Sequence, residues 1–425
     1  MKPPSLPLRS LALTTLVLFA TTLLPEAQAE PPKASKTDKY RLIWTTKPTN
    51  RVTIGWNQKE GKPGTVHFGE TDHGRNAEAY PETQAATHTK KFDGLHNCFA
   101  KIENLKPDTR YYLVISDEFG TSSRFQFLTA PEEAVPFTFI AGGDSRNFRD
   151  VRISANQIVA KLRPLFVAFT GDMINKDTPE EWDEWLDDWQ HTTGEDGHLM
   201  PIVAHRGNHE NRPKSIPAYF NTPSDAYYSF SVGGSLFRYL VLNSEIPAGD
   251  KQGKWLDEQL EKHSSSAVHL VVGYHKPMRP HVSKKSEGTN PFLWAGKFYE
   301  HGVDLAIESD SHVMKRTLPL KPSDSGHEGF IAVENDPKST VYIGEGCWGA
   351  PLRSNDDNKP WTLDSGSFNG FDWIQVSEDK IEIKTVIVEN PSRVGVIDPQ
   401  APFKDPEGLA LWEAKGGTVL TIEAD

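Results

Sequence analysis

Two kinds of hydrophobic pattern follow one another along this chain. Between residues 39 and 129, short runs alternate apolar and polar positions, as in residues 51–56, 110–115 and 124–128, and turn-forming segments such as residues 61–64 (GKPG) separate them. Alternation with a period of two places successive side chains on opposite faces of a strand, and no run with a helical period intervenes. This first pattern predicts a small antiparallel β-sandwich.

Beyond residue 136 the pattern changes to continuous apolar runs that alternate with helix-like segments. The runs cover residues 137–141, 165–169, 201–204, 237–242, 268–272 and 303–307, and the helical segments include residues 151–162, 180–190 and 255–263. Fully apolar strands between helices are typical of a sheet that is covered on both faces. Because residues 227–243 instead predict a hairpin around Gly233 and Gly234, we expect an α/β region with a mixed sheet.

Small groups of polar residues follow most of these apolar runs. They are Asp144 after the first run, Asp172 after the second, Asn208 and His209 after the third, His275 after the fifth, and Asp310 and His312 after the last. Each group alone is a weak signal, since Gly-Asp at a strand end is a common turn. In open α/β sheets, however, the carboxyl ends of the strands line the ligand crevice, so we expect these potential metal ligands to converge.

Composition and charge exclude several classes of protein. The chain has 425 residues, of which 37% are hydrophobic and 24% charged, so collagen-like, disordered and polytopic membrane proteins are poor fits. Its formal net charge of -12 offers no basic footprint, and we expect no nucleic-acid partner. Cys98 and Cys347 are too few for a disulfide scaffold; we favour free buried thiols over the bridge that an oxidising compartment would permit.

The first 29 residues have the pattern of a targeting segment. Lys2 and Arg9 precede an apolar run over residues 11–24, and residues 27–29 (AQA) offer the small side chains that signal peptidase accepts. A retained membrane anchor is the competing interpretation, but the run is short for a span of ~20 residues and is interrupted by threonines. We therefore predict a signal peptide over residues 1–29, no membrane span after its cleavage, and a secreted or periplasmic protein.

The ordered polar groups carry a family resemblance. The succession of Gly-Asp144, Gly-Asp172, Gly-Asn208-His209-Glu, His275 and x-His312 resembles that of the calcineurin-like metallophosphoesterases. Within that superfamily the chain is similar to purple acid phosphatase-like proteins, which carry a fibronectin type III-like domain in front. Residues 105–111 (LKPDTRY) likewise resemble the corner of such domains, where a tyrosine hydroxyl binds the backbone.

The resemblance covers residues 38–395 and implies a domain organisation. We expect a linker over residues 30–38, a fibronectin type III-like (purple acid phosphatase N-terminal-like) domain over residues 39–130, a metallophosphoesterase catalytic domain over residues 131–395 and a C-terminal extension over residues 396–425. The expected fold is therefore an antiparallel β-sandwich followed by a mixed-sheet α/β domain.

The resemblance also implies a dinuclear metal centre and the roles of its residues. Asp172 would bridge two metals, Asp144 and His312 would bind the first, Asn208 and His275 the second, and His209 would act on the leaving group or the phosphoryl oxygens. Two cations about 3.5–4 Å apart need a shared anionic bridge, provide hydroxide near neutral pH and clamp the phosphoryl oxygens. We expect two divalent or trivalent ions, of iron, manganese or zinc, and a small phosphorylated substrate.

Three positions depart from the family pattern. Arg146 stands where a histidine is often found; a guanidinium meets phosphate bidentately, so we assign it to the substrate, with a surface ion pair as the alternative. Asn175 replaces a tyrosine of purple acid phosphatases and could be a weak ligand, a phosphate contact or a helix cap. Asp310 replaces the first histidine of Gly-His-x-His, and as a ligand of the second metal it would favour manganese, magnesium or iron over zinc. Loss of the second metal is the other outcome of this change.

Two hypotheses about function follow. The first is an exported metal-dependent phosphohydrolase that cleaves phosphate mono- or diesters with metal-activated hydroxide, assisted by His209 as general acid or as a stabiliser of transition-state charge. The second is a non-catalytic extracellular binding protein with a degenerate phosphoesterase fold, motivated by Arg146, Asn175 and Asp310. The oligomeric state stays open.

Overall fold

The computed structural model describes residues 1–2, 33–285 and 289–424 of the chain, and Lys33–Asp425 forms one compact unit. The predicted signal peptide falls on residues that lie, apart from the first two, outside the described ones. None of the helices within the described ranges combines the length and the apolar character that a membrane crossing requires.

The first part of this unit is rich in β-strands, as predicted. One antiparallel layer has the order β4 (Glu82–Ala85), β3 (Thr65–Gly69), β7 (Arg110–Asp117) and β8 (Gly120–Thr121), with β9 (Phe125–Leu128) also paired to β7. The other contains β1 (Thr37–Ile43), β2 (Val52–Gln58), β6 (Leu95–Ile102) and β5 (His88–Phe92). Trp56, Val66 and Leu113 belong to one core, and the Tyr111 hydroxyl accepts the Lys106 backbone N–H at 3.0 Å, which is the predicted corner bond.

The second of these layers continues directly into the following region. Strand β1 pairs in parallel with β12 (Pro201–Ala204), and the resulting ten-stranded sheet has the order β24-β23-β22-β10-β11-β12-β1-β2-β6-β5. Its remaining strands are β10 (Phe137–Gly142), β11 (Val167–Phe169), β22 (Gly370–Val376), β23 (Lys380–Ile387) and β24 (Val419–Glu423). The final residues, to which the sequence assigned no structure, therefore end in an edge strand of the main sheet.

A second, seven-stranded sheet faces the first one. Its order is β13 (Tyr228–Val232), β14 (Phe237–Val241), β15 (His269–Gly273), β16 (Leu305–Glu308), β20 (Val341–Gly344), β17 (Met314–Thr317) and β21 (Thr362–Gly366). Strands β14, β15, β16 and β20 are parallel, whereas β13 and β14 form the predicted hairpin, so the sheet is mixed as expected. A small sheet of β18 (Leu320–His327) and β19 (Phe330–Ala332) lies outside it.

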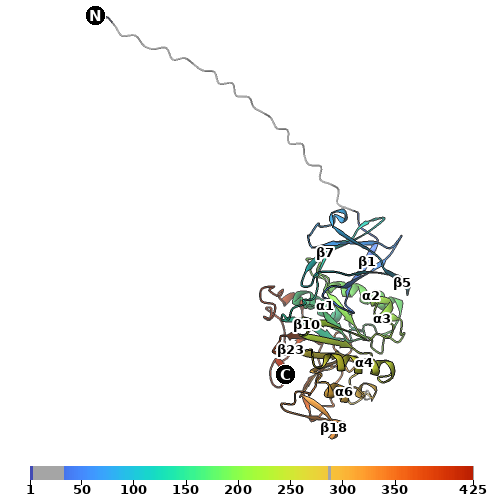
Figure 1. Cartoon of the computed structure of the whole chain (residues 1–425), viewed down its shortest axis with the longest axis vertical. Helices are drawn as coiled ribbons and strands as arrows, with labels where there is room; N and C mark the ends of the chain where they lie inside the picture. The colour runs from blue at the N-terminus through green and yellow to red at the C-terminus, as the bar shows by residue number, and fades with distance from the viewer. Residues whose placement is uncertain (3–32, 286–288, 425) are drawn as a thin grey trace. The chain divides into compact units, whose positions relative to one another are not determined.

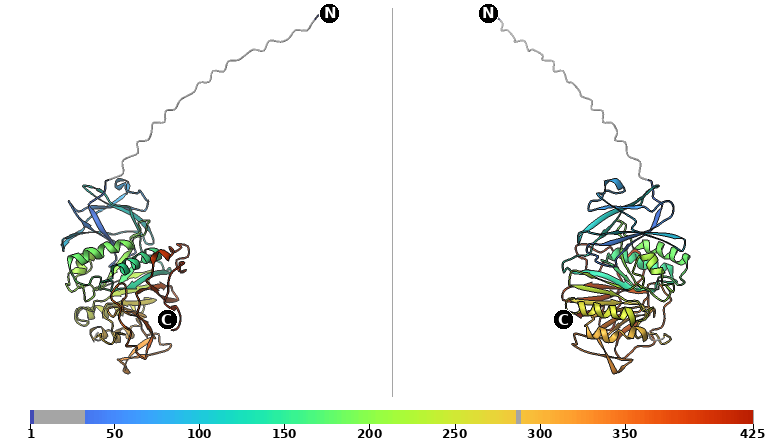
Figure 2. Two further views of the ribbon diagram at one scale, coloured as in Figure 1. Left: turned by 180° about the vertical axis from the view of Figure 1, so that it is seen from behind. Right: turned by 45° about the vertical axis from the view of Figure 1, so that its right-hand side comes forward.

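Helices cover the outer faces of the two sheets (Figures 1 and 2). Helices α1 (Arg149–Leu162), α2 (Pro179–Trp189) and α3 (Ser215–Phe220) pack on the ten-stranded sheet, and α4 (Asp250–His263) and α6 (Ala295–Glu300) on the other, with the short α5 (Thr289–Phe292) before α6. Between the sheets, Phe139 stacks on Phe166 with ring centroids 4.8 Å apart, and both contact Phe237. Cys98 and Cys347 are buried and free, as favoured from the sequence.

Candidate metal centre

The predicted ligands lie in the loops that follow the parallel strands of both sheets. Asp144 follows β10, Asp172 follows β11, His275 follows β15, and Asp310 and His312 follow β16. Four of these side chains come from residues with a left-handed backbone: φ is 58° at Asp144, 54° at Asp172, 71° at Asp310 and 59° at His312. Non-glycine residues rarely adopt this conformation, and such positions concentrate at functional sites.

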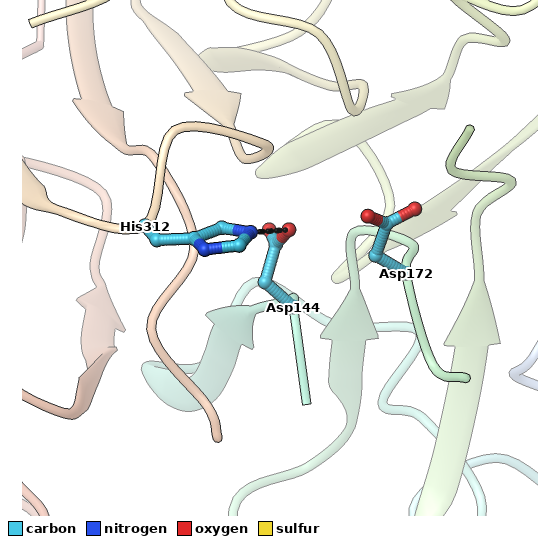
Figure 3. A group of neighbouring side chains, drawn as sticks. All are labelled: Asp144, Asp172 and His312. Carbon is cyan, nitrogen blue, oxygen red and sulfur yellow. Dashed lines mark ion pairs between the residues drawn. The ribbon is translucent and has the colours of Figure 1, made fainter. Parts of the chain in front are cut away.

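Asp144, Asp172 and His312 form a first group of buried ligand atoms that lie within 4.8 Å of one another. Figure 3 shows the imidazole of His312 directed at the carboxylate of Asp144, with the carboxylate of Asp172 on the neighbouring loop. The carbonyl of Pro351 accepts the Nδ1–H of His312 at 2.7 Å, so the other ring nitrogen, Nε2, faces Asp144 Oδ1 at 3.2 Å. This ring nitrogen and this carboxylate oxygen are both atoms of metal-ligand type.

Asp172, His275 and Asp310 form a second buried group, whose ligand atoms also lie within 4.8 Å of one another. The carbonyl of Thr170 lies 2.9 Å from Nδ1 of His275, which leaves Nε2 facing three oxygens. These are Oδ1 of Asp172 at 3.2 Å, Oδ1 of Asn208 at 3.1 Å and Oδ1 of Asp310 at 3.7 Å. Asp172 thus belongs to both groups, which is the arrangement that a bridging carboxylate needs.

The electrostatics of these groups fit cation binding. Oδ1 of Asp144 and Oδ2 of Asp172 are buried and accept no hydrogen bond from any described residue. Burial raises the pKa of Asp172, but His275 and His209 outweigh it and hold that pKa well below its usual range. Burial lowers the pKa of His275, yet the carboxylates of Asp172, Asp144 and Asp310 raise it well above its ordinary value. The donor set thus favours positive charge, which fits a metal ion.

Two family models match the chain. The model described as "Purple acid Phosphatase, N-terminal domain" matches residues 37–129, and the model described as "Calcineurin-like phosphoesterase" matches residues 92–314, more than half of the chain. The chain belongs to the calcineurin-like phosphoesterases.

Individual relatives of the chain include an uncharacterized protein of Mycobacterium tuberculosis, which is 23% identical over 64% of this chain and 60% of its own length. Serine/threonine-protein phosphatase CPPED1 of Homo sapiens is 32% identical over 40% of this chain and 62% of its own length. The matches thus span about three fifths of these curated relatives. A purple acid phosphatase from yellow lupin (Lupinus luteus) shares the fold, with a TM-score of 0.67 at 15% identity over 86% of this chain and 74% of that one.

The three departures from the family pattern all lie at this site. The Arg146 side chain is 10% exposed; its Nε lies 3.4 Å from Asp172 Oδ2, and its Nη2 lies 3.1 Å from His312 Nε2. The alternative of a surface ion pair is therefore wrong. Asn175 accepts a hydrogen bond from Arg146 Nη1 at 2.9 Å, and its alternative role as a helix cap is also wrong, because Thr178 is the N-cap of α2. Asp310 enters the second group, as predicted for a replacement ligand.

His209 lies beside the ligand groups but belongs to neither. Its backbone N–H donates to Asp172 Oδ1 at 2.8 Å, and its Nδ1 lies 2.5 Å from the carbonyl oxygen of Asn175. Since a carbonyl only accepts, Nδ1 carries a proton, and Nε2 is left on a side chain that is 26% exposed, 3.7 Å from Asp172 Oδ2. This is the placement that a proton donor or charge stabiliser for substrate needs.

Glu210, the last residue of the Gly-Asn-His-Glu motif, has a role that the sequence did not assign. Its carboxylate accepts the backbone N–H groups of Asp172, Met173 and Gly207 at 3.0, 2.7 and 2.7 Å, and so joins two ligand loops. A Cβ atom at Gly207 would lie 2.3 Å from Asp172 Oδ1, so only glycine permits this approach. In the sequence, the place of Glu210 in the Gly-Asn-His-Glu motif was the signal that could have pointed to this role.

Another unassigned contact joins the N-terminal β-region to this site. Asp93, in the turn between β5 and β6, accepts hydrogen bonds from Nη1 and Nη2 of Arg212 at 2.8 and 2.5 Å. Arg212 follows Glu210 by two residues and also donates to Asp177 Oδ1 at 2.6 Å, two residues after Asn175. The turn thus braces both loops that carry Asn175 and Glu210. Trp348, which follows β20, is fully buried in the core.

Proposed function

We propose that this chain is an exported phosphohydrolase that cleaves phosphate mono- or diesters at a dinuclear metal centre. The observation that carries the proposal is the shared position of Asp172 in two buried groups of metal-ligand type. Asp144 and His312 would complete the first site, and Asn208, His275 and Asp310 the second. The mixed donors suit iron, manganese or zinc, with Asp310 favouring the harder ions. Export rests on the sequence pattern of residues 1–29, and the domain limits at residues 39–130 and 131–395 are part of the same proposal.

The side chains around the groups have distinct parts in this proposal. Cations bound there activate water as a nucleophile and neutralise phosphoryl oxygens. Arg146 and Asn175 orient the phosphoryl group, because their hydrogen-bonding groups lie beside Asp172 and His312. His209, with Nδ1–H held by the Asn175 carbonyl, would as an imidazolium carry a second proton on Nε2, which it could donate to the departing oxygen or use to stabilise its charge.

The test combines metal content with turnover. Purified full-length protein should hold two metal ions by elemental analysis and hydrolyse an aryl phosphate. Asp172→Asn should lose both ions and reduce turnover by at least about a thousandfold, since several kcal/mol of charge stabilisation disappear. Asp379→Asn, at an exposed position, is the matched control and should change neither. Metal-free wild-type protein without turnover would overturn the proposal.

The alternative, a non-catalytic binding protein, also has an observation in its favour. The guanidinium of Arg146 points at ligand atoms of the first group, and a fixed cation there disfavours a metal ion. In that case the protein would hold at most one ion, and Arg146→Met would raise metal content without creating turnover.

A further inference from the structure

Lys285 reaches into the second ligand group, although nothing in the family pattern assigns it a role. Its Nζ lies 2.5 Å from Oδ1 of Asp310, the same oxygen that faces Nε2 of His275 at 3.7 Å. The side chain of Asp310 is 9% exposed and that of Lys285 is 21% exposed, so this pair is not a loose surface contact. Arg353 donates to the backbone carbonyl of Asp310 at 2.8 Å and leaves the carboxylate to Lys285.

The segment that carries Lys285 is held by backbone hydrogen bonds to the buried carboxylates of Glu308 and Glu345 and to the exposed carboxylate of Asp356. The backbone N–H of Met278 donates to Glu308 Oε1 at 2.8 Å, and that of His281 donates to Glu345 Oε2 at 3.1 Å. Further along, Ser283 N–H donates to Asp356 Oδ1 at 2.8 Å. Glu308 precedes Asp310 by two residues, so the loops of Lys285 and Asp310 share an anchor. The backbone that leads to Lys285 is therefore held beside the loop of Asp310.

The charge of this pair matches the change in ligand type. Replacing a neutral imidazole by the Asp310 carboxylate adds one negative charge to the second group, and the Lys285 ammonium offsets it. A metal ion that binds Oδ1 of Asp310 must displace the ammonium from the same oxygen. Any ligand site that is only partly available has a proportionally weaker apparent affinity.

We propose that Asp310 and Lys285 are a coupled pair that sets the affinity of the second metal site, with Lys285 competing with the ion for Asp310 Oδ1. This inference rests on the proposed function. According to this proposal, the second ion exchanges more readily than the first. A histidine at position 310 would bind the second ion poorly while Lys285 remains. A salt bridge that only stabilises the fold would instead leave metal affinity unchanged.

A double-mutant cycle read out by Mn²⁺ titration calorimetry on metal-stripped full-length protein tests this proposal. Lys285→Met should tighten the weaker Mn²⁺ site by about three- to tenfold, because the competitor is gone. Asp310→His should weaken it by at least about tenfold, because the ammonium then faces an imidazole and an ion without a carboxylate. Additive effects would leave the double variant no tighter than the wild type, whereas coupling predicts that it binds Mn²⁺ at least about threefold more tightly than the wild type, because the imidazole is then free of the ammonium.

The controls separate the possible outcomes. Lys284→Met removes the same charge from the adjacent exposed residue and should leave both Mn²⁺ affinities unchanged. Thermal unfolding without metal shows whether each variant is folded. Additive effects, or a Lys285→Met variant with wild-type affinity, would overturn the coupling while leaving the proposed function intact. Wild-type protein that binds none of Mn²⁺, Fe²⁺ and Zn²⁺ and shows no turnover would overturn the proposed function and this inference with it.

Discussion

The two ligand groups share Asp172 but balance their remaining charge in different ways. In the first group, Arg146 is nearly buried and donates to Asn175 on the loop that follows Asp172. In the second, Lys285 extends from a separate loop to a single carboxylate oxygen of Asp310. A guanidinium with several fixed partners is harder to displace than an ammonium with one. The comparison predicts that Lys285 is the more easily displaced of the two cations, although Arg146 Nη2 also lies 3.1 Å from His312 Nε2, an atom of the first group.

The strongest way to break this comparison is to remove one ligand from each group. His312→Ala should affect the first site alone and His275→Ala the second alone, because each imidazole faces only its own group. We expect one ion instead of two in each case, with turnover lower by roughly a thousandfold. Elemental analysis with aryl phosphate kinetics provides the measurement. If either variant lost both ions, the groups would not be separable sites.

The next effect concerns Arg146. Arg146→Met should raise KM for an aryl phosphate by about ten- to a hundredfold, because charge-assisted hydrogen bonds contribute about 1.5–3 kcal/mol. Steady-state kinetics gives KM and kcat separately. Arg149→Met, at a half-exposed arginine three residues further on, serves as the matched control. An unchanged KM would show that Arg146 does not meet the substrate.

A smaller effect is expected from the turn of the N-terminal β-region. Asp93→Asn weakens the ion pair with Arg212 and loosens the loops of Asn175 and Glu210, so kcat/KM should fall by about three- to tenfold. Steady-state kinetics at temperatures well below unfolding should show the decrease in kcat/KM. Thermal unfolding of the same variant gives its melting temperature for comparison. Asp72→Asn, which breaks the ion pair with Arg124 elsewhere in the same region, should leave kinetics unchanged. A lower melting temperature with normal kinetics would assign Asp93 a stabilising role only.

Asp372, a buried carboxylate outside both ligand groups, should make the free energy of unfolding depend on pH. Burial raises the pKa of Asp372 to about 6, although Thr385 donates a hydrogen bond to it. The Asp372 carboxyl ionises near pH 3.8 in the unfolded chain and near pH 6 in the folded protein. Its contribution to the free energy of unfolding is therefore complete below pH 3.8 and is lost as the pH rises through 6. The loss amounts to about 3 kcal/mol by pH 7. Denaturant unfolding between pH 4 and 7 should show a flatter profile for Asp372→Asn than for wild type. Parallel profiles would mean that Asp372 titrates normally.

Much of the architecture followed from periodicity, because continuous apolar runs mark buried strands. The runs before Asp144, Asp172, His275 and Asp310 became β10, β11, β15 and β16, and their ends converge as expected. Strand β24 was missed because its half-exposed edge position needs no continuous apolar run.

The contacts that set the chemistry of the site were harder to predict. Lys285 lies ten residues beyond His275 in a segment without regular structure, so no period places it near Asp310. Asp93 and Arg212 are 119 positions apart, and only the packing of β5 and β6 beside the loops brings them together. Long-range ion pairs of this kind leave no local signature in the sequence.

The parallel pairing of β1 with β12 bears on how the chain can be divided. Strand β12 leads into the loop of Asn208 and His209, and β1 occupies its outer edge. A fragment beginning near residue 131 would expose the unpaired backbone of β12, a template on which other chains can add strands. Such a fragment should associate or precipitate. By covering the edge of β12, the N-terminal β-region protects the strand that leads to two residues of the site.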